Sequence, residues 1–61
     1  MTADQYSKAK KKLSLSHEKL APCLGISRRQ SIRYAMGQTE IPKAIGIVLQ
    51  LAADGDLILN H

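Results

Sequence analysis

Apolar residues recur along the chain at spacings of three and four, the period of an α-helix, and they do not alternate as in a strand. Phe and Trp, which favour strands, are absent. We therefore predict an all-α fold, a small bundle of four to five helices that forms a single domain over residues 1–61. The helices that the pattern predicts cover residues 3–13, 17–24, 28–36 and 42–53.

Polar residues and glycine mark the helix ends. Thr2 with Gln5 fits a capping box at the start of the first helix. Ser16 and Ser27 are well placed as N-caps of the second and third helices, and Gly25 suits the left-handed end of the second. The second and third helices are thus joined by a short turn, and we predict a helix-turn-helix over residues 17–36.

The positive charges fall in two clusters. Nine Lys and Arg residues against five Asp and Glu residues give a formal net charge of +4, and a basic surplus favours a polyanionic partner. One cluster lies at residues 8–12, and the other consists of Arg28, Arg29 and Arg33 on the third predicted helix. This second cluster points to nucleic acid, whereas the lysine cluster is typical of solvated surface.

Other classes of function have little support in the sequence. Cys23 is the single cysteine, so no internal disulfide forms, and no Cys/His cluster has metal-ligand spacing. The acidic residues are scattered, so we do not expect an enzyme, a cofactor or a small-molecule ligand. No segment is typical of a targeting signal or a membrane helix, and we expect a cytoplasmic protein.

Several stretches of the sequence match a known pattern: 15–21 (Leu-Ser-His-Glu-Lys-Leu-Ala), 24–29, Tyr34, Gly37 and 41–42. In these stretches the chain resembles the Cro- and lambda-repressor-like (XRE) family of helix-turn-helix regulators. Two departures stand out. His17 replaces the family's usual Gln, and Ser31 stands where Ile or Val is usual. Either Ser31 lies on the inner face with Ile32 outward, or Ile32 and Met36 join the core with Ser31 exposed.

The resemblance implies sequence-specific binding of double-stranded DNA by a small transcriptional regulator, a repressor, associated with the nucleoid of a prokaryotic or phage-infected cell. The third helix, residues 28–36, is then the recognition helix in the major groove. We expect base contacts from Arg28, Arg29, Gln30, Ile32 and Arg33. We expect contacts to the DNA backbone from Ser16, His17, Ser27, Gln38, Thr39 and Lys43.

One recognition helix reads too little DNA for specificity, so we expect a homodimer formed by the segment 44–61. The residues predicted for this interface are Ile47, Leu51, Leu57, Ile58 and Leu59. Two alternatives stay open. The apolar C-terminal segment suits a protein-interaction module or an antitoxin that binds another protein. The basic surface also suits nonspecific packaging of nucleic acid.

Overall fold

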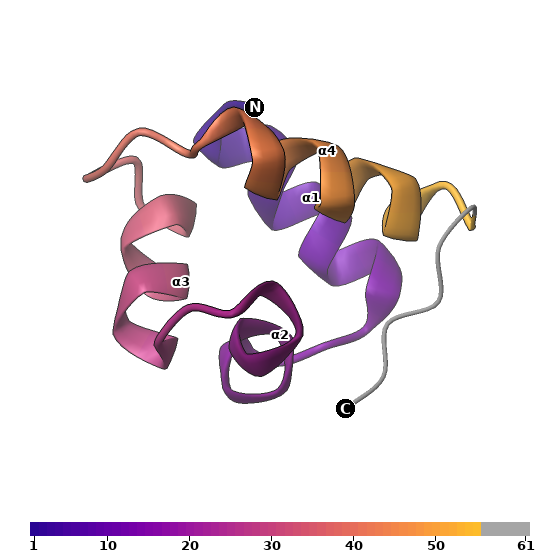
Figure 1. Cartoon of the computed structure of the whole chain (residues 1–61), viewed down its shortest axis with the longest axis horizontal. Coiled ribbons are helices and arrows are strands. Elements are labelled where there is room, and N and C mark those ends of the chain that lie inside the picture. The colour runs from indigo at the N-terminus through magenta and orange to yellow at the C-terminus, as the bar shows by residue number, and fades with distance from the viewer. Residues whose placement is uncertain (56–61) are drawn as a thin grey trace.

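The computed structural model describes residues 1–55, and this part of the chain is all-helical without a strand. Its helices are α1 (Ala3–Leu13), α2 (His17–Leu24), α3 (Arg28–Ala35) and α4 (Lys43–Ala53). α4 packs on α1, and α3 packs on α2 and on α1 (Figure 1). The predicted all-α class is confirmed. The third helix ends one residue earlier than predicted, and the fourth begins one residue later because Pro42 is its N-cap.

Side-chain caps begin the first three helices at the predicted residues. The Thr2 hydroxyl accepts from the backbone N–H of Gln5 at 3.1 Å, and Gln5 Oε1 accepts from the N–H of Thr2 at 2.8 Å, which completes the capping box. The hydroxyls of Ser16 and Ser27 accept from the amides three residues on. Each cap satisfies an amide that has no partner within its helix.

α2 ends in a Schellman motif that sets the turn before α3. Gly25 has a φ of 70°, its N–H donates to the carbonyl of Pro22 at 3.2 Å, and the N–H of Ile26 donates to the carbonyl of Ala21 at 3.0 Å. α3 ends in the same way, with Gly37 in the left-handed position. In Figure 1 α2 is viewed nearly along its axis whereas α3 lies across the view, so the two helices cross steeply.

The core lies where the four helices meet. Tyr6 of α1, Leu20 of α2 and Leu49 of α4 are fully buried. Ala21 is also buried, and its small side chain lets α3 approach α2 closely. The other buried hydrophobic residues are Ala9, Leu24, Tyr34, Ile41, Ala52 and Ala53. Between residues 1 and 55, no helix is long and apolar enough to cross a membrane.

The end of α1 carries backbone strain. Ser14 occupies the left-handed region with a φ of 57°. Among residues 1–55, no other residue except glycine has a positive φ. It takes the position that Gly25 takes in α2, because the amides of Ser14 and Leu15 donate to the carbonyls of Lys11 and Lys10. A side chain at this φ is disfavoured by contact with the backbone.

We expect Ser14→Gly to raise the free energy of unfolding by up to about 1 kcal/mol. The substitution removes backbone strain of about 1–2 kcal/mol, and the greater conformational entropy of glycine in the unfolded state offsets part of that gain. Ser7 is a matched control, since it is exposed inside α1. Ser7→Gly is expected to lower the same quantity by about 0.5 kcal/mol. Urea unfolding followed by circular dichroism measures both, and a change of the same sign in the two variants would contradict the strain at Ser14.

Candidate nucleic-acid interface

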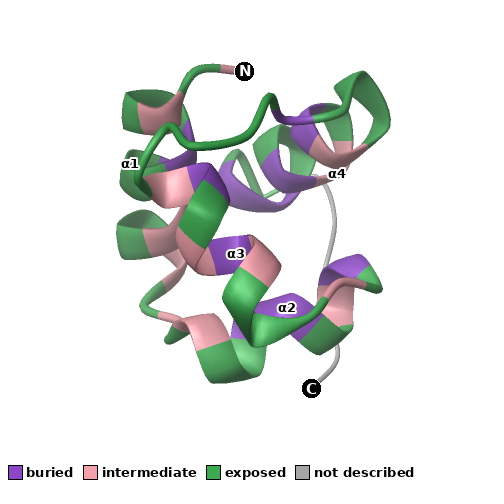
Figure 2. Cartoon of the chain, turned by 90° about the vertical axis from the view of Figure 1, so that its left-hand side faces the viewer, coloured by how far each residue is buried: buried purple, intermediate pink, exposed green. Residues whose placement is uncertain are grey.

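α3 has an inner face in the core and an outer face in solvent. Ser31 and Tyr34 are buried on the inner face. The three arginines of the helix, Arg28, Arg29 and Arg33, are exposed. Figure 2 looks onto this side of the molecule, where the outer surface of α3 faces the viewer below the connection that leads to α4. α3 has no acidic residue, so its outer face is positive.

A shallow hollow of about 390 Å³ lies on the outer face of α3. Its lining residues are Arg28, Arg29, Ile32, Arg33 and Gln38. Four of the five predicted base-contacting residues are thus brought together with one predicted backbone-contacting residue. Ile32 lines the hollow and Ser31 is fully buried, so Ser31 takes the inner position and Ile32 faces outward.

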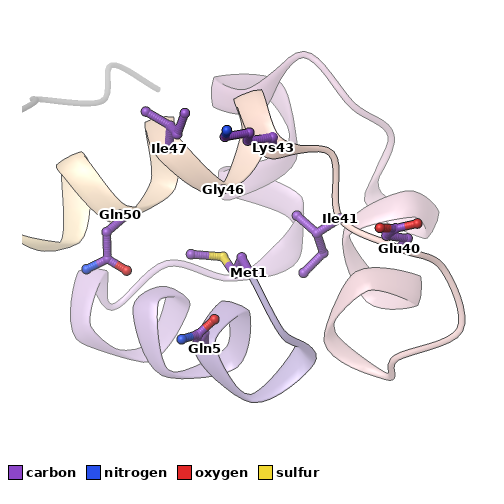
Figure 3. A pocket seen from close by; sticks show the side chains of 8 residues that line it. All are labelled: Met1, Gln5, Glu40, Ile41, Lys43, Gly46, Ile47 and Gln50. Carbon is purple, nitrogen blue, oxygen red and sulfur yellow. The ribbon is translucent and has the colours of Figure 1, made fainter.

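The remaining predicted DNA contacts lie around this hollow or apart from it. Gln30 is half-buried beside the N-cap Ser27, which is exposed. Ser16 is the exposed N-cap of α2, and Thr39 is exposed in the connection between α3 and α4. Lys43 lies apart, in a second hollow of about 410 Å³ between α1 and α4, where Figure 3 shows it on the same helix as Ile47.

The predicted dimer residues divide into two groups. Ile47 and Leu51 are 51% and 41% exposed, and they lie one turn apart on α4. The rest of the predicted interface, Leu57, Ile58 and Leu59, lies outside the described residues.

Behind the arginine face, three polar side chains form a hydrogen-bonded chain. Ser31 Oγ lies 2.5 Å from Tyr6 Oη and 2.7 Å from His17 Nδ1. Tyr6 comes from α1, His17 from the first turn of α2 and Ser31 from the inner face of α3. We call these three side chains the Tyr6–Ser31–His17 chain. It joins three helices at one buried serine, and the ring of Tyr34 packs edge-on against that of Tyr6 with centroids 5.6 Å apart.

The order of donors in this chain follows from burial. Tyr6 and Ser31 are fully buried, and Tyr6 Oη has no other hydrogen-bond partner among residues 1–55. If the Tyr6 hydroxyl donates to Ser31 and the Ser31 hydroxyl donates to His17 Nδ1, every hydrogen has an acceptor. If His17 Nδ1 instead donates to Ser31, either the Tyr6 hydrogen or the Ser31 hydrogen is left unpaired in the buried site, which is costly. His17 is therefore neutral, with its proton on Nε2 and with Nδ1 as acceptor.

The surroundings of His17 favour this neutral form. Burial lowers the pKa of His17 below its ordinary value, and the positive charges of Lys10 and Arg28 lower it further. Burial raises the pKa of Tyr6, and Tyr34 adds to the rise while the hydrogen bond with Ser31 opposes it. Both pKa shifts favour the uncharged forms of Tyr6 and His17 at neutral pH.

A serine bonded to a histidine is also the arrangement of an activated nucleophile. Ser31 Oγ, however, is fully buried and already shared between Tyr6 and His17, so no substrate reaches it in this conformation. Among the described residues, no group of three His, Cys, Asp or Glu side chains is placed to hold a metal ion. Ser31 therefore presents no accessible nucleophile in this conformation, and the exposed charged side chains on this side of the molecule are the arginines.

The sequence alone did not reveal the hydrogen bonds of Tyr6 and Ser31, and it left open whether Ser31 faces the core or solvent. A signal was present, because Ser31 is a polar residue at a core-facing position of the third helix, and a buried hydroxyl needs a hydrogen-bond partner.

We expect Ser31→Ala to lower the free energy of unfolding by about 1–3 kcal/mol, because it leaves the buried Tyr6 hydroxyl without an acceptor. Ser7→Ala, at an exposed position of α1, is the matched control and should change it by less than about 0.5 kcal/mol. Tyr6→Phe should then cost less in the Ser31→Ala background than in wild type. Urea unfolding of the four proteins of this cycle measures the coupling, and strictly additive effects would contradict it.

No family model, no curated protein and no solved structure matches this chain. What the arginine face of α3 binds is therefore inferred from its own geometry and chemistry.

Proposed function

We propose that α2 and α3 form a helix-turn-helix and that the chain binds double-stranded DNA in a sequence-specific manner as a small transcriptional regulator. The observation that carries the proposal is the hollow on the outer face of α3, where three exposed arginines surround Ile32. The short glycine turn before α3 and the steep crossing of α2 and α3 support it.

The chemistry of this face suits the major groove of DNA. The groove admits an α-helix, and the planar fork of an arginine pairs with both N7 and O6 of guanine. Arg29 and Arg33 lie one turn apart, with Ile32 beside them to contact a thymine methyl group. In the proposed complex these three side chains read bases, while Arg28 and Gln30 divide their contacts between bases and phosphates.

Backbone contacts are expected on both sides of α3. The N-terminus of α2 at Ser16 and His17 presents amides and a helix dipole to one phosphate. On the other side, Gln38 lines the same hollow as the arginines and Thr39 follows it in the exposed connection. Lys43 lines a separate hollow between α1 and α4, so we leave it out of the proposed DNA surface.

A second copy completes the proposed regulator. Two recognition helices about 34–36 Å apart meet successive major grooves on one side of the duplex. Ile47 and Leu51 form an exposed apolar strip on α4, and α4 contributes no residue to the arginine hollow. Pairing through this strip buries apolar surface and leaves both α3 helices free.

We expect Arg29→Ala and Arg33→Ala each to reduce discrimination between DNA sequences by about 1–3 kcal/mol, because each removes a bidentate guanine contact. The probes are a duplex selected by the wild-type protein from a randomised library and a scrambled duplex of the same composition. Fluorescence anisotropy at two salt concentrations gives the affinities.

Lys8→Ala is the matched control for charge, since Lys8 lines a hollow formed by α1 and α4 and none of the arginine hollow. It should weaken binding to both duplexes slightly and equally. Selection of no preferred duplex, with equal salt-dependent binding to all, would instead favour nonspecific packaging. No binding to any duplex at low salt would contradict the proposal and favour a protein-interaction module.

We expect wild-type protein to sediment as a dimer and the Ile47→Glu, Leu51→Glu double variant to sediment as a monomer, because the charges destroy the apolar strip. Met36→Glu is the control, since Met36 is a 65% exposed apolar residue at the end of α3. It should stay dimeric. A wild-type monomer at high micromolar concentration, with and without duplex, would contradict the homodimer.

A further inference from the structure

We propose that His17 is a pH-dependent positioning residue for α3: in its neutral form it holds the arginine face in place through Ser31, and its protonation weakens base reading. This inference rests on the proposed function, because it concerns regulation of the same surface. It arises from the Tyr6–Ser31–His17 chain, which a bare helix-turn-helix does not require.

The position of Ser31 on α3 links the Tyr6–Ser31–His17 chain to the orientation of the arginine face. Ser31 lies two residues from Arg29 and two from Arg33, and side chains two apart on a helix point to nearly opposite sides. The hydrogen bonds at Ser31 therefore resist rotation of α3 about its own axis. They anchor the helix to α1 through Tyr6 and to the start of α2 through His17.

Protonation of His17 removes an acceptor from the Tyr6–Ser31–His17 chain. A proton from solvent that binds Nδ1 turns the His17 ring nitrogen from an acceptor into a donor toward Ser31 Oγ. The Ser31 hydroxyl hydrogen then loses its acceptor at His17. Either it stays unpaired while Ser31 Oγ accepts from both neighbours, or it turns toward Tyr6 Oη and leaves the Tyr6 hydrogen unpaired. No proton leaves Ser31 or Tyr6, but a fully buried hydroxyl is now unpaired. Separation of Ser31 from its partners relieves this, at the expense of the fixed rotation of α3.

The charged groups around His17 give the two kinds of DNA binding opposite responses. Lys10 of α1 and Arg28 of α3 are the charges that act on the ring, and both are positive. Protonation adds a third positive charge beside the DNA surface, which favours phosphates of any sequence. Base reading, by contrast, depends on the fixed placement of Arg29 and Arg33. Acidification should therefore lower discrimination while nonspecific affinity holds or rises.

The experiment measures wild-type affinity for the selected duplex and for its scrambled counterpart from pH 8 to pH 4.5 at constant ionic strength, because the lowered pKa of His17 shifts its titration toward acidic pH. Circular dichroism at each pH confirms that the protein is folded. We expect the ratio of the two affinities to fall about tenfold, the loss that one broken buried hydrogen bond produces. The affinity for the scrambled duplex should stay level or rise.

Two variants identify the titrating group. His17→Asn places an amide oxygen near the position of Nδ1, where it accepts from Ser31 but does not take up a proton in this range, so the ratio should become independent of pH. His17→Gln serves the same purpose with a longer side chain if the Asn variant does not fold. His61→Gln is the matched control, because His61 is the other histidine of the chain, and it should behave as wild type.

A wild-type ratio that stays constant down to pH 4.5 overturns the inference, and so does a pH dependence that survives in the His17 variant. Either result leaves the proposed function intact, because the selected duplex is still preferred. A chain that selects no duplex at any pH contradicts the proposed function itself, and the inference with it.

Discussion

The hydrogen bonds that meet at Ser31 are the constraint on which the rest of the structure depends. A domain of 61 residues buries a small core, and here a polar serine sits within that core in contact with Tyr6 and His17. A buried polar group is tolerated only when its partners are in place. The Tyr6–Ser31–His17 chain therefore specifies one arrangement of α1, α2 and α3. Hydrophobic packing alone would leave the rotation of α3 less well defined.

With its inner face fixed in this way, α3 is free to carry charge on the other side. Three arginines on a short helix repel one another, and the Ser27 cap and the packing of Tyr34 hold that helix in place. α4 packs on α1 and keeps its own apolar residues, Ile47 and Leu51, away from the arginine hollow. The proposed DNA surface and the proposed dimer surface thus lie on different elements, so each can be altered without loss of the other.

Most of the fold followed from local signals in the sequence. Ser16, Gly25 and Ser27 set the ends of α2 and α3, because caps and left-handed glycines act within a few residues. The arginine face followed from helical spacing. The partners of Ser31 did not, since Tyr6 lies 25 residues away and its contact depends on how helices pack. The separation of Lys43 from the arginine hollow is likewise a matter of tertiary packing.

The central claim is that the outer face of α3 binds duplex DNA. Titration of the ¹⁵N-labelled protein with a selected duplex, followed by NMR, tests it most directly because each backbone amide reports its own surroundings. We expect the largest chemical-shift changes on residues 27–33, on Gln38 and on the first turn of α2, with α4 little affected by contact. Shift changes confined to Ile47, Leu51 and their neighbours on α4, or absent altogether, would contradict it.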